Sequence, residues 1–390
     1  MPDLALLRPF LDDDHVVLAE RAAEFASRAI APLPAPEDDA AGRRQARELL
    51  ALLGANGWLG HAVPAAAEGE SPYPDLRACC LLRETLAAAS PLADAVFALQ
   101  ALGSLPVALG GAEPLRRRWL PEAAAGRAMA AFAMTEAEAG SDVAALATTA
   151  RRDGGDYLLD GRKVLISNAG IANFYCVFAA TDRAAGARGL SCFLVEAGTP
   201  GLRFAGPQVL SAPHPLGEIE LDGCRVPAAQ RLGAEGEGFK LGMRTLDRLR
   251  PTVAAAACGM AERALAEAVA HARRRRQFGK ALAEFQLVQE KLARSAVDLA
   301  AARLLVYRAA WEGDGGAERL TLPAAMAKAF ATEAAQRIVD DALQVLGGRG
   351  LLADHPVERL YRAVRALRVY EGTTEIQHLI VARELLRPAD

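Results

Sequence analysis

The chain has 390 residues, of which 52% are hydrophobic and 24% are charged, and its formal net charge is −3. This length suits two or three packed domains, while the mild acidity argues against a general nucleic-acid binder, whose domains usually have a pI above about 9. The longest apolar run, at residues 253–261, is about half as long as a membrane span, and the Met1-Pro2-Asp3 start does not resemble a secretory signal, so we expect a soluble cytoplasmic protein with no membrane segment.

The first third of the chain has the apolar spacing of helices. Hydrophobic residues recur three and four apart in three segments, at residues 16–30, 43–53 and 81–102. Clusters of proline and glycine separate these segments. The pattern predicts an N-terminal helical domain over residues 1–130.

The middle of the chain changes to strand-like patterning. Two short apolar runs flank Asp160-Gly161, a pair typical of a hairpin turn. Further short runs follow at residues 174–180, 190–196 and 219–226. We therefore predict a middle domain over residues 131–235 that forms an antiparallel β-barrel or sandwich.

The last third returns to helical spacing. Four long periodic segments occupy residues 253–273, 285–312, 322–346 and 355–370. Segments of this length suit a four-helix bundle over residues 236–390. The predicted fold class is therefore α+β, with helical, β and helical parts in that order.

Cysteine and histidine usage gives no sign of a metal centre. The six cysteines show no C-x-x-C spacing and lie mostly among apolar residues, so we expect buried reduced thiols. The six histidines are scattered and form no H-E-x-x-H motif. The sequence predicts no protein-ligated metal.

Two candidate ligand-binding motifs contain glycine beside hydroxyl or basic groups. In Ala139-Gly140-Ser141-Asp142, glycine would let backbone N–H groups approach an anion or a heteroaromatic edge, although a helix N-cap or a turn also explains the motif. Gly347-Gly348-Arg349-Gly350 ends a predicted helix, where a glycine C-cap and a close approach to a ligand are both open. No strand or G-x-G-x-x-G accompanies it, so it is no dinucleotide fingerprint.

Four consecutive arginines, residues 273–276, end another predicted helix and precede Gln277-Phe278-Gly279. Cations are favoured at a helix C-terminus by the helix dipole, which would explain a solvated basic end. The alternative is a phosphate clamp, because guanidinium groups bind phosphate with a fork of donors. The residues alone leave both interpretations open.

The most informative motif is Tyr370-Glu371-Gly372-Thr373-Thr374-Glu375, at the end of an apolar helix. Burial of Glu371 would raise its pKa, as a general base that works near neutral pH requires. The alternative is a glutamate at the N-terminus of the last helix, where the helix dipole favours negative charge.

In this order and at these separations, the four motifs resemble those of the acyl-CoA dehydrogenase family, and the resemblance covers nearly the whole chain. It implies an enzyme that holds FAD between the β domain and the C-terminal bundle, removes the α-proton of an acyl-CoA thioester and passes the β-hydride to the flavin. Glu371 matches the family's base. A minority of relatives carry the base on the first long helix of the bundle, but residues 245–250 contain no glutamate here.

The resemblance also implies ligand contacts. The matching FAD positions are Phe132, Met134, Thr135, Ser141, Ile166, Ser167, Arg275, Gln277, Phe278, Gln286, Gln344, Gly347, Gly348, Thr373 and Glu375. The matching substrate positions are Ser141, Asp247, Arg250, Tyr370 and Gly372. In the family, the segment from Arg275 to Phe278 reaches the FAD of a neighbouring subunit, which implies a homo-oligomer, usually a dimer of dimers. An electron-transfer flavoprotein is the implied electron acceptor, and fatty acid metabolism the implied setting.

Three positions depart from the family pattern. Leu165 stands where a tryptophan commonly faces the flavin, Ala137 replaces a proline and Ala363 replaces an aspartate. Leu165 cannot stack as an indole does, which affects the flavin's surroundings and the docking of an electron-transfer partner. Two alternatives remain: the same reaction on a carrier-protein thioester, or a flavin-binding relative that has lost dehydrogenation. No motif encodes the length or branching of the acyl group.

Overall fold

The chain, seen here as a computed structural model that describes residues 2–64, 71–317 and 319–387, divides into two compact units. The first unit comprises Met1–Pro34, Asp75–Asp94 and Asp247–Asp390, and the second comprises Ala35–Pro74 and Ala95–Leu246. The helices come first and last along the chain with the strands of the large sheet between them, so the predicted α+β order is confirmed.

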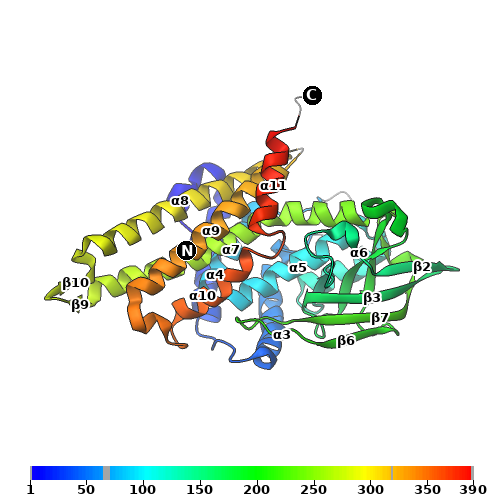
Figure 1. Cartoon of the computed structure of the whole chain (residues 1–390), viewed down its shortest axis with the longest axis horizontal. Coiled ribbons are helices and arrows are strands. Elements are labelled where there is room, and N and C mark those ends of the chain that lie inside the picture. The colour runs from blue at the N-terminus through cyan, green and yellow to red at the C-terminus, as the bar shows by residue number, and fades with distance from the viewer. Residues whose placement is uncertain (1, 65–70, 318, 388–390) are drawn as a thin grey trace. The chain divides into compact units, whose positions relative to one another are not determined.

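The first unit is helical. Its helices are α1 Leu4–Leu7, α2 Asp13–Phe25, α4 Leu76–Ala89, α8 Gln286–Asp314, α9 Thr321–Leu346, α10 Pro356–Leu367, α11 Thr374–Leu385 and most of α7 Gly238–Arg274. A small hairpin, β9 Arg276–Gln277 and β10 Lys280–Ala281, joins α7 to α8 (Figure 1). Helix α9 packs against α8, α10 and α11. The four predicted C-terminal helices are present, and α11 follows them as a fifth.

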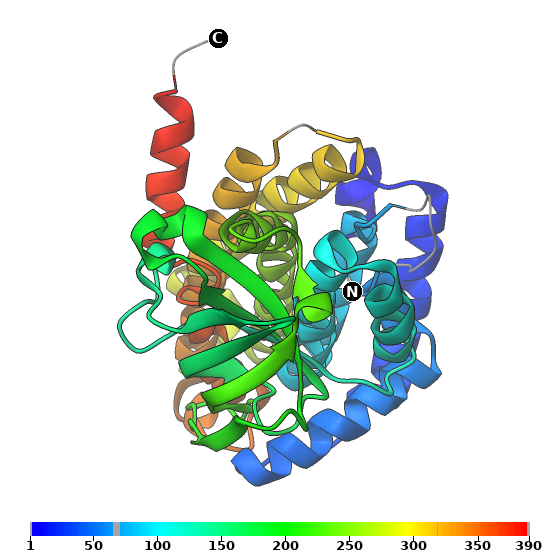
Figure 2. The same cartoon turned by 90° about the vertical axis from the view of Figure 1, so that its right-hand side faces the viewer.

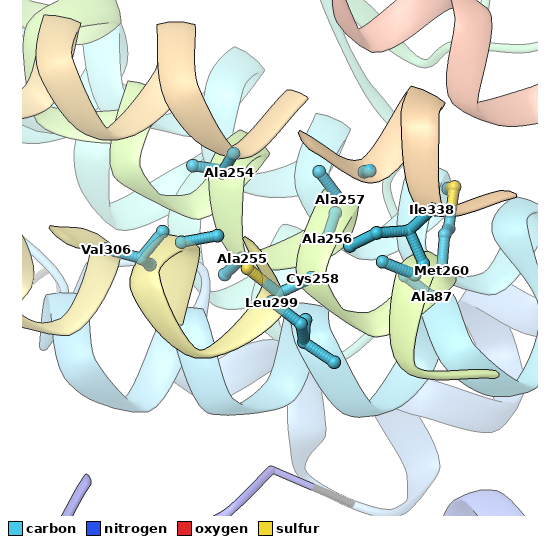
Figure 3. Close-up of a cluster of buried hydrophobic side chains, with 14 of the residues drawn as sticks. Ala87, Ala254, Ala255, Ala256, Ala257, Cys258, Met260, Leu299, Val306 and Ile338 are labelled. Carbon is cyan, nitrogen blue, oxygen red and sulfur yellow. The ribbon is translucent and has the colours of Figure 1, made fainter. Parts of the chain in front are cut away.

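Small side chains let α7 approach its neighbours closely. The alanines at residues 254–257 are fully buried, and they lie among Ala87 of α4, Leu299 of α8 and Ile338 of α9 (Figure 3). A Cβ added at Gly259 would lie 2.0 Å from the backbone oxygen of Glu84. The Ala- and Gly-rich stretch of α7 is therefore a packing requirement of this unit.

The second unit is built on one eight-stranded sheet (Figure 2). Its strands are β1 Ala130–Ala133, β2 Thr149–Asp153, β3 Asp156–Ser167, β4 Phe174–Ala180, β5 Leu190–Glu196, β6 Leu202–Pro207, β7 Leu216–Pro227 and β8 Arg231–Leu232, accompanied by α3 Asp39–Ala55, α6 Glu113–Ala124 and most of α5 Pro91–Gly110. The strand order is β6-β7-β3-β2-β4-β5-β8, with β1 pairing β4. Because β1 and β2 both run parallel to β4, the sheet is mixed, whereas the sequence predicted purely antiparallel pairing.

The predicted hairpin turn at Asp160-Gly161 is wrong. Strand β3 runs through both residues, and its pairing with β7 shifts register between Leu159 and Gly161. Gly161 has φ 154°, and a Cβ there would lie 2.4 Å from Thr148 Oγ1. The glycine therefore marks a bulge in a long strand, and the turn lies between β2 and β3, where Gly154 has φ 61°.

The single helix predicted over residues 81–102 is interrupted. Helix α4 ends at Ala89, Ser90 is extended with φ −156°, and α5 begins at Pro91. Proline disfavours helical backbone in the residue before it and is well placed in the first turn of a helix. The Ser90-Pro91 pair therefore separates two helices that apolar periodicity alone joined.

Helix α5 is the one helix in the described ranges that is long and apolar enough to cross a membrane by length and composition. However, 72% of its most apolar window is buried within the structure. A core helix of a globular domain passes the same test, so α5 is only weak support for a membrane span.

We expect Gly259→Ala to lower the free energy of unfolding by about 1–3 kcal/mol, the cost typical of inserting a methyl group into a packed core. The matched control is Gly198→Ala, because a Cβ at Gly198 has nothing within 4 Å. Urea unfolding of both variants measures the difference. An unchanged stability of Gly259→Ala would contradict the close approach of α7 and α4.

Candidate active site

A left-handed turn connects α10 and α11 in the first unit and carries the predicted base. Helix α10 ends at Leu367, and Glu371 and Gly372 follow with φ 53° and 91°. A Cβ on Gly372 would lie 2.5 Å from Gln377 Nε2, and its φ of 91° would strain any other residue there. Helix α11 begins at Thr374 and is capped by the Thr373 side chain, which accepts from the Ile376 N–H. Glu371 therefore precedes the last helix and is no part of its first turn, which removes the dipole interpretation.

The carboxyl group of Glu371 is partly buried and lacks a hydrogen-bonding partner on one oxygen. Its Oε2 atom has no such partner within the described residues and almost no solvent contact. Burial raises the pKa of Glu371 above its usual value, against the opposing charges of Arg83, Lys328 and Arg250. The carboxylate is thus a stronger base than a solvated one, yet three nearby cations keep its anionic form accessible.

Three side chains hold the backbone of this turn by its carbonyl oxygens. Arg250 Nε donates to the Glu371 oxygen at 3.3 Å, and Lys328 Nζ donates to the Gly372 oxygen at 2.6 Å. Gln377 Nε2 contacts both oxygens, at 3.2 and 3.0 Å. The Glu371 N–H has no acceptor among the described residues, so it is available to a ligand.

A buried ion pair lies close enough to Glu371 to affect its pKa. Arg83 of α4 donates to both carboxylate oxygens of Asp94, at 2.7 and 2.9 Å, and to Thr252 Oγ1 at 3.0 Å. Both charged side chains are less than 5% exposed. Because Asp94 compensates Arg83, the guanidinium remains charged and buried beside the carboxylate that it stabilises.

The predicted substrate residues Asp247 and Arg250 contact one another. They form an ion pair one turn apart on α7, and Thr321 Oγ1 donates to Asp247 Oδ2 at 2.9 Å. Arg250 is 4% exposed and is the member that reaches the turn. Tyr370 is 41% exposed. The first unit therefore brings Asp247, Arg250, Glu371 and Gly372 into one connected network.

In the second unit, a buried ion pair supports the end of β1. Lys163, which is fully buried, donates to Glu136 Oε1 at 2.7 Å and to the Met134 backbone oxygen at 3.1 Å. Burial lowers the pKa of Lys163 to about 8, although Glu136 opposes this shift. Thr135 lies between Met134 and Glu136, the two residues that Lys163 contacts. Its backbone oxygen accepts a hydrogen bond from the Val164 N–H, while its own N–H and hydroxyl have no partner within the described chain.

A neighbouring loop holds the end of β3 in place through contacts with Ser167 and Leu165. Ser167 Oγ lies 2.8 Å from His214 Nε2, and the Leu165 N–H donates to Gln208 Oε1. Burial lowers the pKa of His214 to about 4, so its imidazole is neutral at physiological pH. Leu165 has φ 55° and is 53% exposed, which leaves an apolar side chain beside the predicted flavin position.

Not every predicted residue of the second unit presents its side chain. Met134 is 5% exposed and Ile166 is 1% exposed, so a contact from Ile166 would come from its backbone. Ser141 is exposed, and Gly140 before it has open space where a Cβ would stand. Phe132 is half-buried and stacks at a tilt on Phe178, with ring centroids 4.8 Å apart.

The remaining predicted FAD residues lie at exposed positions of the first unit. Helix α9 ends at Leu346, and Gly347 follows as its C-cap with φ 60°. Both Gly347 and Gly348 have open space where a Cβ would stand. Arg275 and Arg349 are exposed. Burial is the main cause that lowers the pKa of His271, and the charges of these two arginines lower it further. The exposed members of this group are Arg275, Gln277, Phe278, Gln286, Gln344, Gly347, Gly348 and Glu375.

Sequence reasoning missed several residues of the site. Lys328, Gln377, Arg83 and Asp94 surround the turn, and His214 contacts Ser167. A lone lysine in the alanine-rich segment at 324–331 was the available signal for Lys328. The other residues come from segments whose proximity only the fold creates.

All six cysteines are free and buried, as predicted. Within the described ranges no group of three or more histidine, cysteine, aspartate or glutamate residues could hold a metal ion.

Comparison with known proteins finds one family along nearly the whole chain. Three family models, described as the N-terminal, middle and C-terminal domains of acyl-CoA dehydrogenase, match residues 12–127, 131–224 and 236–386. A probable acyl-CoA dehydrogenase of Mycobacterium leprae, FadE25, is 38% identical over 380 residues, which are 97% of this chain and 96% of the relative.

Solved structures agree over the same length. Butyryl-CoA dehydrogenase from Megasphaera elsdenii is 33% identical, with a TM-score of 0.88 over 97% of this chain and 99% of that one. A chain from work on the electron transferring flavoprotein of Acidaminococcus fermentans is 36% identical, with a TM-score of 0.91 and the same coverage.

The descriptions of two further solved structures name proline or a prolyl carrier protein instead of an acyl-CoA. PigA, described with FAD and proline, is 29% identical with a TM-score of 0.87 over 96% of this chain and 98% of its own. The prolyl acyl carrier protein oxidase AnaB is 29% identical with a TM-score of 0.86 over 97% and 100%.

We expect acid to destabilise the protein partly through His214. The folded state holds its pKa at about 4, against 6.5 for the unfolded chain, so the unfolded state binds the proton first as the pH falls. Between pH 7 and pH 5 this linkage removes about 1–2 kcal/mol of stability. Urea unfolding at both pH values should show a smaller loss for His214→Gln, whereas His378→Gln, at an exposed site, should lose as much as wild type. Equal losses in all three proteins would refute the assignment.

Proposed function

The chain belongs to the acyl-CoA dehydrogenase family of oxidoreductases, and from that premise we propose that it is an FAD-dependent enzyme that introduces an α,β double bond into an acyl-CoA thioester. Glu371 would remove the α-proton, and bound FAD would supply the oxidising group that takes up the β-hydride. The substrate is a saturated thioester, and the product is the corresponding enoyl thioester.

The observation that carries this proposal is the state of the Glu371 carboxylate. Its Oε2 atom is buried without a hydrogen-bond partner within the described residues, and burial raises its pKa. An α-proton next to a thioester is too weakly acidic for a solvated carboxylate to remove efficiently, so the base needs desolvation. A carboxylate with a structural role would instead have its oxygens satisfied, as those of Asp94 are by Arg83.

The turn supports a second role for Glu371. Proton removal places negative charge on the thioester oxygen, and a preorganised backbone donor stabilises such charge effectively. The Glu371 N–H lacks an acceptor within the described chain, while the carbonyl oxygens of the turn are occupied by Arg250, Lys328 and Gln377. We infer that this N–H binds the thioester oxygen, so one residue holds the substrate and removes its proton.

The donor groups suit the two ends of FAD. Among the described residues nothing pairs with the N–H and hydroxyl of Thr135, which could bind the flavin ring, and the Lys163–Glu136 pair holds the adjacent backbone. The exposed Arg275 and Arg349, with the open Gly347-Gly348 backbone, suit an anionic pyrophosphate. Met134, Thr135 and Ser167 would therefore hold the flavin ring in the second unit. The arginine and glycine group of the first unit would bind the phosphates of an FAD carried by a second copy of the chain.

We propose that the chain forms a homo-oligomer, in which the segment from Arg275 to Phe278 reaches a neighbouring subunit. Phe278 is 92% exposed at a positive φ of 50°, an expensive position for an aromatic residue in an isolated chain. Helix α8 exposes Leu287, Val297 and Trp311, and α11 exposes Leu379 and Leu385. A subunit contact would cover these exposed apolar side chains. A second copy that receives Phe278 and Arg275 near its own FAD accounts for these positions, and a dimer of dimers accounts for the helix faces.

Two further proposals concern the setting. An electron-transfer flavoprotein is the proposed acceptor, and the exposed Leu165 is the feature that would meet it in place of an aromatic ring. The six reduced cysteines fit a reducing compartment such as the cytoplasm.

Replacement of the base tests the proposed reaction. We expect Glu371→Gln to slow flavin reduction by about 10²–10⁴-fold, the usual contribution of a general base. Anaerobic stopped-flow mixing of the FAD-loaded protein with straight and branched acyl-CoA thioesters would follow the loss of oxidised-flavin absorbance. Glu24→Gln, an exposed carboxylate on α2, is the control and should reduce at the wild-type rate.

Two results would count against the proposal. If acyl groups on a carrier protein reduce the wild-type flavin and no acyl-CoA does, CoA is not the carrier of the substrate, and the proposed dehydrogenation of a thioester stands. If Glu371→Gln is reduced as fast as wild type, Glu371 is not the base.

Flavin retention tests the phosphate site without an activity assay. Loss of a charge-assisted hydrogen bond costs about 1.5–3 kcal/mol, so Arg275→Ala should bind FAD roughly 10- to 100-fold more weakly. Titration of the apoprotein with FAD, followed by flavin fluorescence, measures the affinity. Arg263→Ala, which breaks a surface pair with Glu267 on α7, is the control. Equal affinities of the two variants would place the phosphates elsewhere.

A further inference from the structure

The most unusual charged group near the turn is Lys328 of α9, whose side chain is completely buried. Its ammonium group donates to the Gly372 oxygen at 2.6 Å, and this is the one hydrogen bond that the structure gives it among the described residues. An ammonium group has three donors and is costly to remove from water. A methionine would fill the same space without that desolvation, so packing does not explain the lysine.

We propose that Lys328 is a positioning residue for the reaction, which holds the left-handed turn through the Gly372 oxygen and supplies the positive charge that keeps Glu371 ionised. This inference rests on the proposed role of Glu371 as the base.

The geometry gives the mechanical half of this role. A glutamate at φ 53° is strained relative to an extended or helical residue. Contacts from Lys328 and Gln377 to the Gly372 oxygen, and from Arg250 and Gln377 to the Glu371 oxygen, oppose that strain. Of these donors, only Lys328 and Arg250 are cations. Removing Lys328 leaves Gln377 alone on the Gly372 oxygen, so the turn loses its strongest constraint there.

The electrostatic half is reciprocal. Burial lowers the pKa of Lys328 to about 8, and Glu371 is the carboxylate that most strongly opposes this shift. Lys328 in turn lowers the pKa of Glu371 against the effect of burial. The charged groups that face the pair are Arg83 of α4, Asp94 of α5, Arg250 of α7, Glu333 of α9 and Glu375 of α11.

The test compares Lys328→Met with Lys328→Arg in the FAD-loaded enzyme, using the pH dependence of anaerobic flavin reduction at saturating thioester. Lys328→Met should slow reduction at least tenfold, and its acid limb should move to higher pH because Glu371 has lost a stabilising cation. In wild type the rate should fall above about pH 8, because Lys328 then loses its proton and with it the charge-assisted hydrogen bond that holds the Gly372 oxygen. Lys328→Arg keeps its charge at that pH, so it should retain the wild-type acid limb and lack the alkaline one.

Stability separates positioning from folding. Removing one cation from a buried charge group costs stability, so the melting temperature and FAD content of Lys328→Met are measured before its kinetics are compared with those of wild type. Lys240→Met, at an exposed lysine of α7, is the control for loss of a positive charge and should keep the wild-type profile. A folded, FAD-loaded Lys328→Met with wild-type rates and pH limbs overturns the proposal. Should Lys328→Met unfold, the acid and alkaline limbs of Lys328→Arg decide it alone: a retained alkaline limb refutes it.

The outcome is distinguishable from failure of the proposed function. If Glu371→Gln reduces as fast as wild type, the base assignment fails whatever Lys328 does. If Glu371→Gln is inactive and Lys328→Met is unaltered, the base stands and only its positioning by Lys328 is rejected.

Discussion

The structure of the first unit depends on burying a carboxylate without satisfying it. The Oε2 atom of Glu371 is buried without a hydrogen-bond partner among the described residues, which costs free energy that the surroundings must offset. Arg83, Lys328 and Arg250 provide the compensating field from three different helices. Two of these cations have a carboxylate partner of their own, Asp94 beside Arg83 and Asp247 beside Arg250. The charge network around one turn thus links α4, α5, α7, α9 and the segment before α11.

The second unit follows the same principle at a separate place. Its buried Lys163–Glu136 pair holds the Met134 oxygen and, through two further contacts to Glu136, the N–H groups of Ala147 and Thr148. A buried ion pair contributes little net stability, because desolvation offsets most of the attraction. What it does provide is a defined position for the backbone around Thr135. In both units, therefore, buried charge fixes the geometry of a short segment that the proposed reaction uses.

Several errors of sequence interpretation share one physical cause. Asp160-Gly161 is a good hairpin pair, yet β3 continues through it because Thr148 packs where a side chain of residue 161 would stand. The apolar periodicity of residues 81–102 continues across Ser90-Pro91, although α4 ends at Ala89 and α5 begins at Pro91. Apolar spacing reports which face of a segment is buried and says little about where the backbone changes direction. Local turn chemistry is decided by the neighbours that a turn must accommodate.

The sequence by itself determined the α+β order of helices and strands, the buried reduced cysteines and the family, because periodicity and the four motifs in their order are read directly along the chain. It also marked Glu371, since a carboxylate between an aromatic residue and glycine is recognisable without coordinates. Only the tertiary structure decided what surrounds that carboxylate. Lys328 lies 43 positions before Glu371, and Arg83 lies farther still, so no spacing rule could associate them. Their effect on Glu371 arises from helix packing, and charge interactions depend on distance in space rather than on separation along the chain.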